Sequence, residues 1–391
     1  MFDRWRVSIK MKVHGNRKSM MRDPFVIGIS GSIGSGKSLI RHLLAMRGVM
    51  PLDADELTHF LLMKGKAGYQ EVVRNFGETY LDNSGNLDRA RLGTDVFGNP
   101  RSLQKLESLL HPLVSKTVHS ILQKSSSPLI ALEAIKLYTS DLTQLCDSRW
   151  FVTATPAAQR ERLKRTRGMD DKAITERLHQ QHFPKEMSID HYIENSCLVG
   201  DVAQQIEIIW KDMLQETHGF EQVIECLAET INMPVLSIDS LATIDAKMQG
   251  YLAEFLPSHQ RIPDGDFAQR VILSRTFLSP LENSDDMLVW QFDHFNTRIR
   301  ILINDKKDDN LQNGLEILER QTSTWGGNCI MVELDARSLQ FQDELRSMGY
   351  RILSDADITE HPFLSFSIGN KGKIGNHLVK ILPGGVWRLI P

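Results

Sequence analysis

The sequence predicts an α/β fold in which helices cover a parallel sheet, followed by a separate α+β domain. Up to about residue 214, short apolar segments alternate with longer amphipathic ones, as parallel strands alternate with helices. A glycine-rich string, G-S-I-G-S-G-K-S at residues 31–38, directly follows the first apolar segment. From about residue 220 the order changes to consecutive strands and separate helices, which indicates a second domain.

The predicted elements of the first half are four strands and a long helical insertion. The strands are expected at residues 25–30, 49–53, 129–133 and 150–154, and a helix at 202–214. The stretch 55–124 is mostly helical and too long for a simple crossover, so it predicts an inserted helical region. Ligands of such folds bind at the carboxyl ends of the strands, where we therefore expect the site.

The predicted elements of the second half, residues 220–391, are four strands and two helices. They are strands at 287–292, 297–303, 328–334 and 350–353, with helices at 310–324 and 339–348.

Residues 31–38 form a phosphate-binding loop of the pattern G-x-x-x-x-G-K-[ST]. Gly34 and Gly36 allow a tight turn whose backbone N–H groups point toward a polyphosphate. Lys37 reaches the β- and γ-phosphates, and Ser38 offers its hydroxyl to Mg²⁺. Residues 39–44 continue as a helix, whose positive end also favours an anion. The chain is therefore expected to use a nucleotide.

Composition excludes several other classes of function. The 391 residues carry a formal net charge of −3, which gives no electrostatic footprint for nucleic acid or an anionic membrane. The sequence has no apolar run of the ~18 residues that a membrane helix needs. Four widely spaced cysteines without a C-x-x-C pair argue against a zinc site or a disulfide framework and indicate a cytoplasmic protein.

Residues 1–23 are basic and have no apolar core, so they do not form a secretory signal. We expect a disordered extension. If translation begins at Met20 or Met21, the residues before that methionine come only from an upstream choice of start codon.

Acidic residues end two of the predicted strands. Asp53 can accept a proton from an attacking hydroxyl or hold a metal through water, with a cap of the next helix as the alternative. Asp55 is expected to cap that helix, with a functional role as the alternative. Glu133 suits a position near Mg²⁺ or a structural role. Lys136 follows it and suits either an anionic ligand or an ordinary surface position.

A dense basic run, R-E-R-L-K-R-T-R-G at residues 160–168, is typical of a lid that closes over phosphates, with a plain surface helix as the alternative. Asn195 follows a short strand and suits contact with the nucleotide base or a turn.

Several blocks in order resemble the dephospho-CoA kinase family over residues 24–214. They are I-G-I-S-G-S-I-G-S-G-K-S at 27–38, L-D-A-D at 52–55, L-D-R at 87–89 with V-F at 96–97, L-E at 106–107 through H-P-L-V at 111–114, R-L at 162–163, R-L at 177–178 with Gln181, and Ile193 with Asn195 and Ser196.

The resemblance implies a P-loop NTPase-type parallel sheet of the nucleoside-monophosphate-kinase kind, with the insertion 55–124 for the acceptor and a lid at 157–185. Its implied cofactors are ATP and Mg²⁺, and its small-molecule substrate is dephospho-CoA. The implied reaction phosphorylates the ribose 3′-hydroxyl and yields CoA and ADP, the final step of coenzyme A biosynthesis. No nucleic-acid or membrane partner is expected.

The site residues carried over from the family fall into three groups. ATP would be held by Gly34, Ser35, Gly36, Lys37, Ser38 and Leu39 together with Asn195. Asp53 would act as the base, with Lys37, Arg162 and Arg165 stabilising charge, Ser38 on Mg²⁺ and Glu133 as a second candidate near the metal. Asp53, Arg89, His111, Pro112 and Lys136 would face the acceptor, although His111 before a proline also suits a packed turn.

Two departures from the family pattern concern the acceptor segment and the lid. The family usually reads Asp-hydrophobic-Pro-Leu-Leu-Phe-Glu after the third strand, whereas residues 133–139 read E-A-I-K-L-Y-T. The family's second lid arginine aligns with Thr166, so Arg165 or Arg167 would replace it.

Within residues 220–391, the runs 299–303, 311–324, 329–334 and 342–351 loosely resemble the later half of a GNAT-type acetyltransferase. The glycine-rich pyrophosphate loop of that family is replaced by N-D-K-K-D-D at 304–309, whose acids would repel an anion. We therefore expect a non-acetylating domain that stabilises or regulates the kinase. Two alternatives for the whole chain stay open: another small-molecule kinase on the same scaffold, and a nucleotide-dependent scaffold protein.

Overall fold

The computed structural model describes residues 23–181, 183, 186–230, 233–244, 249, 267–281, 287–302, 310–334, 338–365 and 377–391. Residues 1–22 of the expected N-terminal extension and the segment 304–309 lie outside these ranges.

The first half folds around a five-stranded parallel sheet in the order β2-β3-β1-β4-β5, which confirms the predicted fold class. The strands are β1 (Phe25–Gly31), β2 (Met50–Asp53), β3 (Leu129–Glu133), β4 (Ser148–Thr153) and β5 (His191–Glu194). Every residue of β3 is buried, as expected of an inner strand covered on both faces. The register pairs Asp53 with Glu133, so two carboxylates meet at the carboxyl edge of the sheet.

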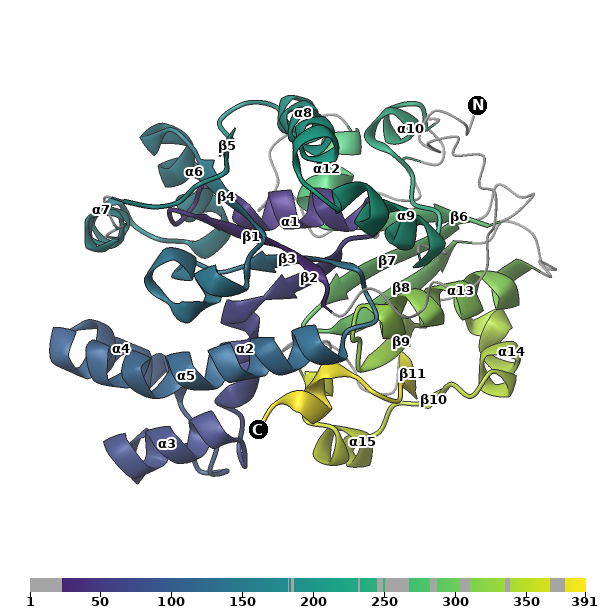
Figure 1. The fold of residues 1–391 in the computed structure, drawn as a ribbon. Helices are drawn as coiled ribbons and strands as arrows, with labels where there is room; N and C mark the ends of the chain where they lie inside the picture. The colour runs from purple at the N-terminus through teal and green to yellow at the C-terminus, as the bar shows by residue number, and fades with distance from the viewer. Residues whose placement is uncertain are drawn as a thin grey trace.

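Helices cover this sheet and extend from it (Figure 1). Close to the sheet lie α1 (Lys37–Ala45), α8 (Val199–Glu216) and α9 (Phe220–Thr230). Between β2 and β3 the chain forms α2 (Ala54–Leu61), α3 (Ala67–Phe76), α4 (Arg89–Phe97) and α5 (Pro100–Lys124). After β4 come α6 (Pro156–Arg167) and α7 (Asp171–Gln180).

The helix α5 shows how local sequence sets an element. Asn99 caps it by accepting hydrogen bonds from the N–H groups of Arg101 and Ser102, and Pro100 occupies the first turn, where its missing N–H is harmless. The helix continues through Pro112 because Leu110, Val114 and the apolar positions after them are buried. Within the described residues, none of the helices combines the length and apolarity of a bilayer span.

The second half contains a six-stranded mixed sheet in the order β10-β11-β9-β8-β7-β6. Its strands are β6 (Phe277–Pro280), β7 (Met287–Asp293), β8 (Asn296–Leu302), β9 (Cys329–Glu333), β10 (Arg351–Ile352) and β11 (His377–Ile381). Its helices are α10 (Ile238–Ala242), α12 (Phe267–Leu273), α13 (Asn310–Thr324), α14 (Gln342–Ser347) and α15 (Asp355–Glu360). The strands β8 and β9 are parallel and α13 lies between them in sequence, whereas the other pairs are antiparallel.

One expected element of the second half divides in two. The helix expected at 339–348 is a 3₁₀ turn, Ser338–Phe341, followed by α14. The tighter turn brings Phe341 into the core at 5% exposure, and Leu345 of α14 is also buried.

The two halves share one hydrophobic core. Phe60 of α2 is fully buried, and its ring centroid lies 6.0 Å from that of Phe295 and 5.8 Å from that of Trp387. Trp325 donates a hydrogen bond of 3.2 Å to the carbonyl of Gly48. The C-terminal end lies beside the insertion helices in Figure 1, where the carbonyl of Pro391 accepts from the N–H of Ala67 at 2.9 Å. The second domain thus packs on α1, α2 and β2 as part of the same folded body.

We predict that Phe60→Ala destabilises both halves together. Truncation of a buried phenylalanine leaves a cavity and costs about 3–5 kcal/mol of unfolding free energy. Urea unfolding followed by far-UV circular dichroism and tryptophan fluorescence checks this, since Trp150 of the first half and Trp290 and Trp325 of the second are all buried and report on unfolding of both halves. Phe76→Ala, in the outer cluster of the insertion, is the control with a smaller effect. Two separate transitions, with only one shifted by Phe60→Ala, would contradict a shared core.

His42, at the interface between the two halves, makes the stability of the protein sensitive to acid. Its ring lies 4.6 Å from Phe277 of the second domain, and its Nε2 is buried without a hydrogen-bond partner. Burial, then the charges of Arg275 and Arg41, lower its pKa from 6.5 to about 3. Between these two values the unfolded chain binds a proton that the folded chain rejects, so stability falls as pH falls.

We predict that His42→Leu reduces the loss of stability between pH 6.5 and pH 4. Urea unfolding of wild type and variant across this range measures the two slopes. His119→Leu, on the exposed face of α5, should keep the wild-type slope. Equal slopes for His42→Leu and wild type would mean that His42 does not carry the sensitivity.

Candidate active site

The phosphate loop joins β1 to α1 in a conformation that only glycine adopts easily. Gly34 and Gly36 have φ of 75° and 88°. A Cβ atom at Gly36 would also lie 2.1 Å from Nδ2 of Asn195, so a side chain has no room there. The loop glycines of the sequence pattern are therefore required by backbone geometry and by close packing.

The loop's polar groups fit a nucleotide triphosphate. Lys37 is 6% exposed, and its ammonium donates to the carbonyls of Gly31 at 3.0 Å and Ser32 at 3.1 Å. Ser35 Oγ is buried and has no hydrogen-bond partner, which marks a polar atom suited to an incoming ligand. Ser38, half-buried in the first turn of α1, offers the hard oxygen that Mg²⁺ prefers.

A buried ion cluster stands beside the loop. Arg41 donates from Nε to Glu133 at 2.8 Å and from Nη2 to Asp53 at 3.1 Å. All three side chains are buried or nearly so, with exposures of 8%, 9% and 13% for Arg41, Glu133 and Asp53. Burial and then the charge of Asp53 raise the pKa of Glu133. Burial alone would lower the pKa of Arg41, but the two carboxylates outweigh it and raise that pKa.

Arg41 was missed by the sequence reasoning, although a signal was present. It lies four residues after Lys37, on the same face of α1. An arginine at that place in the otherwise apolar run L-I-R-H-L-L needs a buried acidic partner.

Asp53 combines two contacts. Its Oδ1 accepts from the N–H groups of Asp55 at 2.9 Å and Glu56 at 3.2 Å, and its Oδ2 faces Arg41. Asp53 is therefore the N-cap of α2, whereas the expectation that Asp55 is the cap is wrong, because Asp55 already lies in the first helical turn. The cap holds the Asp53 carboxylate in one orientation at the carboxyl edge of the sheet.

Arg162 and Asn195 form hydrogen bonds with the backbone of the phosphate loop and with each other. Asn195 donates from Nδ2 to the carbonyl of Ser35 at 2.8 Å, and Arg162 donates from Nη2 to the carbonyl of Asn195 at 2.5 Å. Arg162 Nη1 also lies 3.4 Å from the carbonyl of Gly34. Burial and then Arg165 lower the pKa of Arg162. These contacts place Arg162 and Asn195 together at the loop backbone.

The helices α6 and α7 contact the tip of the loop. Gln159 donates to Ser32 Oγ at 2.5 Å, and the N–H of Ile33 donates to Gln181 at 2.7 Å. Ile33 also packs in a small cluster with Leu163 and Ile174. Gln181 belongs to one of the sequence blocks that resemble the family, whereas Gln159 was not singled out, because an amide gives no charge signal in sequence.

The lid arginines differ in what they face. Arg165 pairs with Glu161 of its own helix at 2.8 Å, whereas Arg167 is close enough to Lys37 for its charge to add to the burial that lowers the Lys37 pKa. Thr166 donates back to the carbonyl of Arg162 at 2.7 Å and so does not face the loop.

The expected acceptor residues fall into two places. His111 and Pro112 lie in the middle of α5, so the turn alternative for His111 is wrong; buried neighbours keep the helix intact there. Lys136 forms an ion pair with Glu107. The half-buried His111 lies near both charges, and its pKa is lowered, mainly by burial. Arg89 stands apart at the start of α4, exposed and close to His59.

We predict that Arg41→Met costs about 3–5 kcal/mol of unfolding free energy, because two buried carboxylates lose their shared cation. Adding Glu133→Gln should recover part of that loss. Urea unfolding of the single and double variants measures it. Arg47→Met, which removes a more exposed pair with Glu207, is the matched control and should cost about 1 kcal/mol or less. If Arg41→Met were as mild as this control, the cluster would not organise the site.

Known proteins match this part of the chain. A family model described as dephospho-CoA kinase matches residues 25–199. The dephospho-CoA kinase of Gloeobacter violaceus is 35% identical over 156 residues, covering 40% of this chain and 76% of that protein. The dephospho-CoA kinase of Carboxydothermus hydrogenoformans is 32% identical over 197 residues, covering 48% of this chain and 96% of that protein.

A solved structure, the crystal structure of TT1252 from Thermus thermophilus, is 28% identical, with a TM-score of 0.42, and the match covers 49% of this chain and 98% of that one. From the sequence matches, the chain belongs to the dephospho-CoA kinase family of ATP-dependent kinases.

Proposed function

We propose that residues 24–214 transfer the γ-phosphoryl group of ATP to the ribose 3′-hydroxyl of dephospho-CoA, giving CoA and ADP. The observation that carries this proposal is the buried cluster of Asp53, Arg41 and Glu133 beside the phosphate loop. It holds one capped carboxylate at the strand end where an acceptor hydroxyl and the triphosphate would meet.

ATP binding is assigned to residues Gly34, Ser35, Gly36, Lys37, Ser38 and Leu39, together with Asn195, which donates to the carbonyl of Ser35. The loop N–H groups and the Lys37 ammonium would bind the phosphate oxygens. Ser38 would hold Mg²⁺, which neutralises phosphate charge when bound. Glu133, at the end of β3 beside β1, would be a further acidic group near the metal. When phosphates enter, the Lys37 ammonium would exchange its loop carbonyls for them.

Asp53 is the proposed acceptor of the proton. The 3′-oxygen forms a bond to the γ-phosphorus, the bond to the bridging oxygen of ADP breaks, and the hydroxyl proton moves to the Asp53 carboxylate. The hydrogen bonds from the N–H groups of Asp55 and Glu56 fix that carboxylate in place. Most of the catalysis would then come from positioning and electrostatic stabilisation.

The lid arginines would stabilise charge in the transition state. Arg162 already lies at the loop backbone, where its guanidinium counters negative charge. Arg165 forms a pair within one helix with Glu161, whose side chain is 71% exposed. Such pairs contribute little to stability, so Arg165 can exchange this partner for a phosphate at small cost.

The acceptor would bind along α2, α4 and α5. His111, Pro112 and Lys136 lie together on the side nearer the sheet, and Arg89 lies farther out. We propose no nucleic-acid or membrane partner, and place the enzyme in the cytoplasm, because Cys146, Cys197, Cys226 and Cys329 form no disulfide bonds.

For the second half we propose a GNAT-like, non-acetylating domain that stabilises the kinase. Its support is the parallel pair β8 and β9 with α13 between them in an otherwise antiparallel sheet, and the core that it shares with α2.

We predict that the purified full chain converts dephospho-CoA, ATP and Mg²⁺ to CoA. Lys37→Ala and Asp53→Asn should each lower kcat about 10²-fold or more, since each removes a group that acts at the transferred phosphoryl or its acceptor. Chromatographic detection of CoA against time measures the rates.

Lys116→Ala and Asp141→Asn remove the same charges at exposed positions and should keep the wild-type rate. Wild-type protein that binds ATP but forms no CoA would refute the kinase assignment. Equal turnover of unrelated alcohol acceptors would favour another small-molecule kinase.

A further inference from the structure

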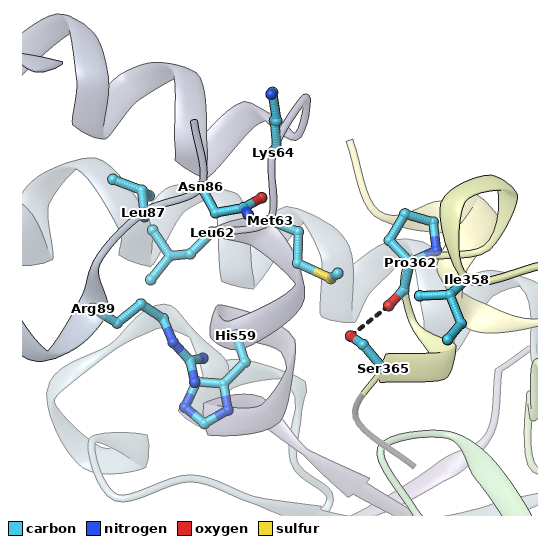
Figure 2. Close-up of a pocket in the computed structure, with 10 residues that line it drawn as sticks. All are labelled: His59, Leu62, Met63, Lys64, Asn86, Leu87, Arg89, Ile358, Pro362 and Ser365. Atoms are coloured by element: carbon cyan, nitrogen blue, oxygen red, sulfur yellow. Dashed lines mark hydrogen bonds between the residues drawn. The ribbon is translucent and has the colours of Figure 1, made fainter. Parts of the chain in front are cut away.

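A pocket of about 340 Å³ opens between the insertion helices and the second domain (Figure 2). Its lining comes from residues 59–89 of the first half and residues 358–365 of the second half. The lining residues are His59, Leu62, Met63, Lys64, Asn86, Leu87, Arg89, Ile358, Pro362 and Ser365.

The pocket has one wall from each domain. The kinase wall is formed by the end of α2 and the chain that leads into α4. The opposite wall consists of Ile358 in α15 with Pro362 and Ser365 just after it; we call these three residues the α15 wall. In Figure 2, Met63 extends toward Ile358 and Pro362 across the space.

The kinase wall continues from the site of phosphoryl transfer. The helix α2 begins at its cap, Asp53, and His59 lies six residues farther on, about 9 Å along the helix axis. Glu56 and His59 lie three residues apart on one face of α2, and Met63, just beyond the end of that helix, lines the pocket together with His59. The Asp53 charge acts on His59, which shows that the two are electrostatically close.

The chemistry of the pocket changes along its length. Arg89 and His59 lie together at one end in Figure 2, and the rest of the lining is mainly apolar, from Leu62, Met63 and Ile358 among others, with polar groups of Lys64, Asn86 and Ser365 between them. Burial, then the charge of Arg89, lower the pKa of His59 to about 4, so near neutral pH the histidine is uncharged. Arg89 therefore supplies the positive charge at that end, followed by a mainly apolar channel; Lys64, the other cation of the lining, donates to the carbonyl of Ser84 at 2.9 Å.

We propose that the second domain completes the acceptor site: Arg89 binds the diphosphate of dephospho-CoA, and the α15 wall binds its pantetheine arm. The inference rests on the proposed function, because it assumes that the reacting ribose lies at Asp53. From that ribose the substrate extends through an anionic diphosphate into a long arm of methyl, methylene and amide groups. This order matches a cation followed by an apolar channel with a few polar groups.

Two substitutions in the full-length chain test the α15 wall. Ile358→Asp places a charge on the apolar wall, and Ser365→Trp adds bulk at an exposed position, away from the core. Thr359→Asp is the matched control for the first, since Thr359 is exposed on the same helix outside the pocket. Ser347→Trp is the control for the second: Ser347, like Ser365, is exposed and donates to the carbonyl three residues earlier at 2.7 Å.

We expect each test variant to raise KM for dephospho-CoA about tenfold, as loss of one apolar contact surface implies, with kcat and KM for ATP unchanged. Both controls should match wild type. A KM for dephospho-CoA equal to wild type in Ser365→Trp would overturn the proposal, whether or not Ile358→Asp folds. A change in the unfolding midpoint without a change in KM for dephospho-CoA would also overturn the proposal, because that result is expected if the α15 wall has only a structural role.

Direct titration of dephospho-CoA separates this proposal from the reaction itself. If wild type binds dephospho-CoA and both test variants bind it about tenfold more weakly, the pocket is retained even where no CoA is formed. If CoA is formed and binding is equal in all variants, the reaction stands and the α15 wall does not take part.

Discussion

The structure depends on one buried cation shared between two carboxylates. Arg41 joins α1 to the ends of β2 and β3 through Asp53 and Glu133, at exposures too low for water to replace it. Because α1 also starts at Lys37, the same helix fixes the phosphate loop and the proposed base relative to each other. The separation of these two groups is then set by rigid elements rather than by loops.

The second domain adds a constraint on the other side of α2. Phe60 packs against Phe295 and Trp387, so the helix that is capped by Asp53 at one end is held by the second domain along its length. The C-terminal carbonyls of Pro391 and Ile390 accept hydrogen bonds from Ala67 and Lys66, just beyond that helix. A domain without a phosphate loop of its own can in this way affect both the stability and the acceptor side of a kinase.

Much of the first half could be predicted from sequence, because its signals are local. The loop glycines, the apolar run of β3 and the basic run of α6 each specify an element through neighbouring residues. The sequence signals only that Arg41 needs an acidic partner; which partners it has, and what the α15 wall faces, could not be predicted from neighbouring residues. The cap was expected at Asp55 with Asp53 as the alternative, and it is Asp53, since sequence alone does not show which carboxylate precedes the first helical turn.

The most direct test of the central claim is ³¹P NMR of the full chain mixed with ATP, Mg²⁺ and dephospho-CoA. The account predicts that ADP signals grow in step with a new phosphomonoester signal from the 3′-phosphate of CoA. Growth of ADP with inorganic phosphate alone, at a rate that does not depend on dephospho-CoA, would contradict it.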